Sequence, residues 1–170
     1  MVAARKRWLF VAAGLAFGLL LMAATPLNAQ SDCKAILAAA RKISITVTHV
    51  YSTTTRNGKE TTGEMIFLPG VYYWRTDNSN WSSGPMSAEE WAETLKLKTW
   101  ADNVACEHVK DESVNGEMAG IYSWHDAATG RDTRIWISKA NGAPLRQEVD
   151  SARGTHSSTR FEYGRVKPPM

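Results

Sequence analysis

The residue types that most often carry catalysis or bind metals are few in this chain and widely spaced. The four histidines form no i, i+4 pair and no local cluster; they are His49, His108, His125 and His156. The chain has no Gly-x-Ser-x-Gly, no His-Glu-x-x-His and no glycine-rich phosphate loop. The sequence therefore predicts no catalytic residue, no metal site and no cofactor, and an enzyme is the least favoured class.

The two cysteines, Cys33 and Cys106, are too far apart for a redox-active Cys-x-x-Cys motif. Two thiols without a matching histidine cluster also do not resemble a zinc site. In an exported chain, two cysteines have one possible pairing. We therefore expect a disulfide that joins an N-terminal helix to the middle of the chain, worth roughly 4 kcal/mol in the chain-entropy model.

Two arginines on consecutive predicted strands, Arg134 and Arg146, offer a second kind of chemistry. They could bind an anionic head group. Cross-strand pairing with Glu148 or Asp132 is the simpler explanation, because opposite charges on neighbouring strands attract one another.

Tryptophan is the unusual feature of the composition. Six of the seven tryptophans follow residue 29: Trp74, Trp81, Trp91, Trp100, Trp124 and Trp136. Two interpretations remain open. The large side chains fill the core of a sheet that has few helices to cover it, or they surround an apolar cavity, since ligand sites are typically concave and apolar.

Alternating residues predict antiparallel strands as the elements that position these side chains. The clearest hairpin has the apolar run Ile135-Trp136-Ile137, the turn Asn141-Gly142 and a returning strand that starts at Pro144. Strands are predicted at 43–51, 64–68, 71–76, around Trp81, and at 107–114, 117–126, 132–138, 145–151 and 159–166.

Two helices are predicted, at 31–42 and 87–98. Ser87 and Glu90 have the spacing of a capping box, which marks the start of the second helix. Trp91 and Leu95 then form an i, i+4 apolar pair opposite a charged face. This helix, which lies between two blocks of strands, is expected to cover the sheet as a lid.

The closing hairpin resembles that of the LolA-like periplasmic lipoprotein-carrier superfamily. The resemblance rests on Trp136-Ile137, on Asn141-Gly142-Ala143-Pro144-Leu145-Arg146, and on the terminal segment from Arg160-Phe161-Glu162-Tyr163 to Pro168-Pro169. The order of a helix, strands, a helix and further strands is also similar. The resemblance implies a half-open barrel with a helical lid that carries acyl chains, although this chain is shorter than the carriers.

Residues 1–29 have the layout of a secretory signal peptide, in which Arg5-Lys6-Arg7 precedes an apolar run from Trp8 to Ala24. We expect cleavage near Ala29 and a periplasmic or secreted protein. An uncleaved anchor is the alternative, but the run is shorter than the ~20 residues of a spanning helix. These residues account for the whole net charge of +3. The near-neutral remainder argues against a nucleic-acid binder.

The sequence thus predicts a mainly β (α+β) protein in which residues 30–170 form one LolA-like half-barrel domain. About eight or nine strands form a curved antiparallel sheet, with both helices on its concave side.

Two short helices cannot cover such a sheet completely. We therefore expect an apolar cavity beneath the 87–98 helix, lined by Ile45, Val47, Phe67, Trp91, Leu95, Ile135 and Ile137. The expected ligand is a lipid, an acyl chain or a lipoprotein, with no stable membrane insertion after cleavage. The alternative is a cell-envelope protein–protein interaction module without a cavity, which would expose an apolar patch instead.

Overall fold

The computed structural model describes residues 27–87, 90, 104–164 and 166–169. This part of the chain contains one helix and nine strands. Their bounds are α1 (Leu27–Ile45), β1 (Thr48–Arg56), β2 (Lys59–Leu68), β3 (Val71–Thr76), β4 (Ser82–Pro85), β5 (Cys106–Val114), β6 (Glu117–Asp126), β7 (Arg131–Ser138), β8 (Pro144–Ser151) and β9 (Thr155–Tyr163). The predicted strands are all present, and β3 and β6 have the predicted bounds.

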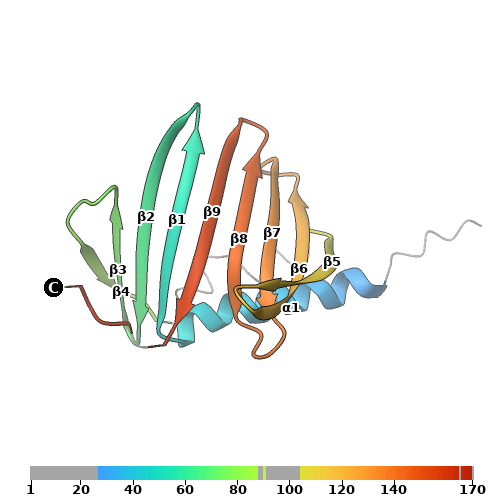
Figure 1. Ribbon diagram of the computed structural model, residues 1–170, viewed down its shortest axis with the longest axis horizontal. Helices are drawn as coiled ribbons and strands as arrows, with labels where there is room; N and C mark the ends of the chain where they lie inside the picture. Colours follow the sequence, from blue (N-terminus) through green and yellow to red (C-terminus); the bar gives the residue numbers. More distant parts are fainter. Residues whose placement is uncertain (1–26, 88–89, 91–103, 165, 170) are drawn as a thin grey trace, which may run out of the picture.

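The nine strands form one open, curved antiparallel sheet in the order β4-β3-β2-β1-β9-β8-β7-β6-β5 (Figure 1). Seven of the eight neighbouring pairs are hairpins between consecutive strands. The exception is β1 with β9, which pair along nine residues and join the two halves of the sheet. The sheet does not close into a barrel, because β4 and β5 remain at opposite edges. The predicted fold class is confirmed.

Asn-Gly dipeptides make two of the tight turns between consecutive strands. Asn57 and Gly58 have φ values of 52° and 74°, and Asn115 and Gly116 have values of 50° and 86°. Two successive positive φ values are the requirement of the type I′ turn, whose twist matches that of a β-hairpin. These turns set the register of β1 with β2 and of β5 with β6.

The first helix is longer than predicted, and the strand predicted to start at Ile43 starts later. α1 continues to Ile45 and β1 begins at Thr48. Ile43 is buried against Val50 and Phe161, so this β-branched residue keeps the helical spacing of Cys33 and Ile36. Ile45 is 72% exposed. The alternation of Ile43, Ile45 and Val47 was therefore wrongly interpreted as a strand, and Ile45 does not face the core.

The sheet has two faces, which we call the helix face, toward α1, and the outer face. Ile135 and Ile137 pack with Ile36 of α1, so they lie on the helix face. Trp136 points to the outer face, because side chains alternate along a strand. There it is buried with Ala119 and Ile121.

A disulfide bond links Cys33 of α1 to Cys106 of β5, as predicted. The predicted capping box is also present: the Ser87 amide donates to Glu90 Oε2 at 2.7 Å, and the Glu90 amide donates to Ser87 Oγ at 3.1 Å. The rest of the predicted second helix lies outside the described residues. Within the described residues, no helix has both the length and the apolar character needed to cross a membrane.

Candidate ligand-binding surface on the helix face

The residues predicted to line one apolar cavity are placed in different parts of the molecule. Ile135 and Ile137 are buried beneath α1, in a cluster with its residues Cys33, Ile36 and Ala39. Phe67 belongs to a second cluster, around Ile43. Val47 is half-buried just before β1. Trp91 and Leu95 lie outside the described residues, so a cavity beneath their helix stays a prediction.

A strip of aromatic rings leads from the second cluster to the surface of β3; we call Phe67, Tyr72 and Trp74 the aromatic strip. The ring centroids of Phe67 and Tyr72 are 6.4 Å apart, and those of Tyr72 and Trp74 are 4.7 Å apart, with nearly parallel planes. Gly84 makes room for this stack, because a Cβ there would lie 3.2 Å from the Tyr72 ring.

The exposed end of the aromatic strip opens into a hollow of about 380 Å³. Its lining residues on the helix face are Ser52, Gly63, Met65, Tyr72, Trp74 and Thr76. Trp74 is 36% exposed, which is unusual for so large an apolar side chain. The sheet thus presents an open apolar surface beside its own core.

A second hollow, of about 550 Å³, is lined by residues of the same face at the tips of the hairpins. These tips lie at the end of the sheet away from α1 (Figure 1). We call it the arginine hollow. Its lining residues are Thr54, Arg56, Ala128, Thr129, Arg131, Val149, Ser151, Arg153, Thr155 and Ser157. The described lining contains three guanidinium groups and five hydroxyl groups but no carboxylate.

None of the three arginines of the arginine hollow, Arg56, Arg131 and Arg153, forms an ion pair in the part of the chain that the structure describes. A carboxylate on this face belongs to Asp126, which is paired in register with Arg131. The Thr129 hydroxyl donates to Asp126 Oδ2 at 2.7 Å, and the Ala128 amide donates to Oδ1 at 2.9 Å. These bonds, with that from Thr129 first, and then the positive charge of Arg131 lower the pKa of Asp126.

Sequence reasoning missed the arginine hollow. It considered only Arg134 and Arg146 for an anionic head group, with cross-strand pairing as the simpler explanation. Arg146 forms an ion pair with Glu148, but within β8 and not across strands as predicted. Its guanidinium lies 5.0 Å from the centroid of the Trp136 ring on the outer face. The arginines of the hollow come from three separate segments of the chain. Hairpin register relates Arg131 to the turn that holds Arg153, but only the pairing of β1 with β9 brings Arg56 to them, and no local sequence pattern predicts that pairing.

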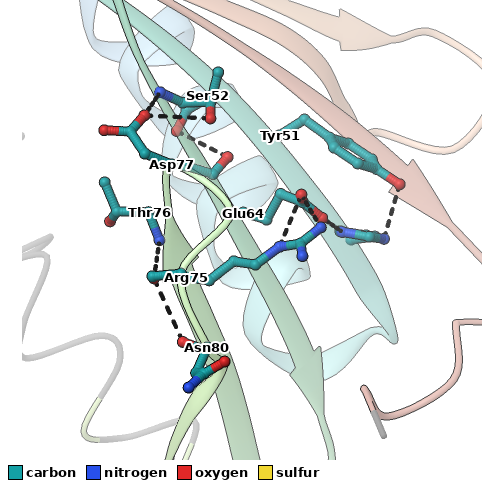
Figure 2. A network of polar contacts seen from close by, with 11 residues as sticks. Tyr51, Ser52, Glu64, Arg75, Thr76, Asp77 and Asn80 are labelled. Carbon is teal, nitrogen blue, oxygen red and sulfur yellow. Dashed lines mark hydrogen bonds and ion pairs between the residues drawn. The ribbon is translucent and has the colours of Figure 1, made fainter.

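The outer face carries a chain of polar contacts from Tyr51 to Arg75 (Figure 2). The Tyr51 hydroxyl hydrogen-bonds to His49 Nδ1 at 2.9 Å, and His49 Nε2 lies 3.1 Å from Glu64 Oε2. Arg75 Nε donates to Glu64 Oε1 at 3.0 Å. Burial, followed by the charge of Glu162, raises the pKa of Tyr51. This phenol is therefore held protonated, which is the opposite of an activated nucleophile.

Among the described residues, no group of three or more His, Cys, Asp and Glu side chains is placed to hold a metal ion. The polar chain of Figure 2 instead connects β1, β2 and β3 through side chains that satisfy one another. Its arrangement stabilises the sheet without leaving a free acid or base beside a hollow.

No protein-family model matches the chain, and no curated protein matches it significantly in sequence. Solved structures do match its fold. The Pseudomonas aeruginosa MucA/MucB complex matches with a TM-score of 0.56 and 11% identity, over 81% of this chain and 59% of that one. The Mycobacterium tuberculosis lipoprotein LppX matches with a TM-score of 0.52 and 12% identity, over 82% and 97%.

A LolA superfamily protein from Nitrosomonas europaea is also matched, with a TM-score of 0.35 and 10% identity, over 81% of this chain and 95% of that one. The chain spans only 57–60% of the MucB chains. MucB and LppX have LolA-like folds, so the LolA-like fold indicated by the sequence is confirmed. At these identities the likeness shows the fold alone.

Proposed function

We propose that this chain is an exported binding protein that holds a hydrophobic ligand against the helix face of its sheet. The ligand class is a lipid, an acyl chain or the acyl part of a lipoprotein. The observation that carries the proposal is the aromatic strip, which continues the core out to an exposed Trp74 beside an open hollow. An apolar surface of this kind is stabilised when a ligand removes it from water.

Export is supported by the Cys33–Cys106 disulfide, because such bonds persist in oxidising compartments outside the cytoplasm. It fits the expected signal peptide at residues 1–29, and a periplasmic or secreted location follows from both. The proposed role is binding rather than catalysis, because the contacts from Tyr51 to Arg75 pair their histidine and carboxylate with each other on the outer face. Glu64 and Arg75 of this network also border the hollow beside Trp74, where each already has a partner.

A protein-interaction module is the second candidate. MucB, which shares the fold, is solved in complex with MucA, so a sheet of this kind can support a protein partner. In this chain the strands β4 and β5 are sheet edges, and an edge strand offers unpaired backbone groups to a partner. This candidate requires no apolar ligand.

The first prediction tests ligand binding with a fluorescent fatty-acid probe. The wild-type protein is expected to bind it, and Trp74→Asp is expected to weaken binding at least tenfold (about 1.4 kcal/mol), because a charge would then face the apolar tail. Trp81→Asp is the matched control. Trp81 lies on the outer face, where its ring centroid is 4.8 Å from the Arg75 guanidinium.

Circular dichroism of both variants checks that the sheet is folded. If the wild-type protein is well folded but does not bind the probe, the carrier function is overturned and the interaction module is favoured. An equal loss in the two variants would also count against the helix face as the site. Native mass spectrometry of protein purified from its own compartment then separates a bound lipid from a bound protein.

A further inference from the structure

The three arginines of the arginine hollow approach one space from three directions. Arg56 ends β1, where it is paired in register with Thr155 of β9. Arg131 begins β7, where it is paired with Ser151 of β8. Since β1, β9, β8 and β7 are consecutive, Arg56 and Arg131 lie three strand spacings apart, or roughly 14 Å at ~4.8 Å per strand.

Arg153 fills the middle of this row, because it lies in the turn that joins Ser151 of β8 to Thr155 of β9. That turn is fixed by its neighbours. The Thr155 amide donates to Ser151 Oγ at 3.2 Å, and the Ala152 amide donates to the Gly130 carbonyl of the next turn at 3.0 Å. The guanidinium groups therefore line a hollow whose walls are already ordered.

Hydroxyl groups complete the floor of the arginine hollow. Thr54 and Ser157 are hydrogen-bonded to each other at 2.7 Å, between β1 and β9. Hydroxyls can donate to an anion as well as to each other. The hollow has three cations, with Asp126 at one side bonded to its own turn. Its size is within the usual range of small-ligand sites, about 300–1,000 Å³.

We propose that the arginine hollow binds a phosphate group. Guanidinium groups recognise phosphate oxygens with paired, parallel hydrogen bonds, and several of them around one site favour a group with several anionic oxygens over a single carboxylate. The phosphate is either free or the head group of a lipid.

The lipid source rests on the proposed function, and the layout of the helix face supports it. Ser52, which lines the apolar hollow, and Thr54, which lines the arginine hollow, are two residues apart on the same face of β1. That spacing is about 6.8 Å. A third hollow, lined by Thr54, Arg56, Asn57, Lys59 and Thr61, continues the basic rim onto β2. An amphiphile can thus place its tail on the aromatic strip and its head among the arginines.

The experiment measures binding of three probes by calorimetry: inorganic phosphate, dihexanoyl-phosphatidylglycerol below its micelle concentration, and neutral dihexanoylglycerol. Arg131→Gln and Arg56→Gln, on different strands, are expected to weaken both phosphate-bearing probes tenfold or more and to leave the neutral lipid within twofold. Arg134→Gln is the matched control, since Arg134 is three residues along β7 on the outer face, paired in register with Glu148.

Tighter binding of the phospholipid than of inorganic phosphate identifies a lipid head group, and equal binding identifies free phosphate. The phosphate site is overturned if the wild type binds neither phosphate-bearing probe, or if Arg134→Gln weakens binding as much as Arg131→Gln. If the phosphate site is overturned but the neutral lipid still binds, the proposed function is unaffected. Binding of inorganic phosphate without either lipid would instead keep the phosphate site and reject the lipid carrier.

Discussion

Tyr163, the last residue of β9, shows how a single buried hydroxyl couples this sheet to pH. Its hydroxyl donates to the carbonyl of Pro144 at 2.7 Å, at the start of β8. Burial raises the pKa of the Tyr163 phenol well above its ordinary value. The folded state therefore holds this proton more tightly than the unfolded state. Its contribution to stability is complete below about pH 10 and is lost as the pH rises further.

The second prediction is that Tyr163→Phe reduces the loss of folding stability at alkaline pH. At pH 8 the variant should be less stable by about 1–3 kcal/mol, because the buried Pro144 carbonyl loses its donor. Between pH 9 and pH 11 its unfolding free energy should fall less than that of the wild type. Urea unfolding at both pH values measures this, with Tyr73→Phe as control; an identical pH dependence in all three proteins would contradict it.

At the residue scale, the sequence predicted the features that have a local or a unique solution. The Cys33–Cys106 bond follows from having two cysteines, and the Ser87–Glu90 capping box follows from a spacing of three residues. The arginine hollow has no such signal. Arg153 is one turn residue among several, and only the three-dimensional arrangement gives it two basic neighbours.

At the element scale, α1 is the element whose bounds secondary-structure propensity predicted least well. The β-branched residues Ile43 and Ile45 favour a strand when they are considered alone. Helical spacing from Cys33 and Ile36 to Ile43 decided the outcome instead, because it lets one apolar stripe reach both core clusters. Tertiary packing often overrides propensity in this way. The strands were better predicted, since three of their turns carry an Asn-Gly dipeptide.

The third prediction concerns the attachment of α1. Two links hold it to β5: the disulfide, and Asp32 Oδ2, which accepts from the His108 amide at 3.0 Å. The disulfide closes a loop with a sequence separation of 73. Cys33→Ala with Cys106→Ala should lower the unfolding free energy by roughly 4 kcal/mol, mainly by freeing the unfolded chain. Urea unfolding of the oxidised wild type, the reduced wild type and the double variant measures this, and equal midpoints would refute it.

At the scale of the whole molecule, the pairing of β1 with β9 is the feature that no local sequence pattern predicts. Each hairpin joins strands that are neighbours in sequence, whereas Val50 and Phe161 meet from opposite ends of the described chain. Closing so long a loop carries an entropic cost that local propensity does not reveal. The candidate site depends on the same pairing. Arg56 meets Arg131 and Arg153 only because β1 lies beside β9.

This arrangement has a consequence for cooperativity. The half-sheet β4-β3-β2-β1 and the half-sheet β9-β8-β7-β6-β5 share the β1–β9 ladder. α1 also touches both, since Ile36 packs with Ile135 in one half and Ile43 packs with Val50 in the other. Neither half has a separate helix in the described part of the chain. The two halves should therefore unfold as one unit.

The final prediction tests this cooperative unfolding at Phe161, which is 8% exposed and packs beside Val50 where β9 pairs with β1. Phe161→Ala should cost about 3–5 kcal/mol through lost apolar burial and the space left behind. Hydrogen exchange followed by mass spectrometry should show protection falling by the same free energy in β2–β3 and in β6–β7. Met118→Ala, at a side chain that is 51% exposed, should change neither by more than about 0.5 kcal/mol. If β6–β7 kept wild-type protection while β2–β3 exchanged freely, the halves would be independent folding units. The phosphate site would then be assembled only when the two halves dock, because Arg56 belongs to one and Arg131 to the other.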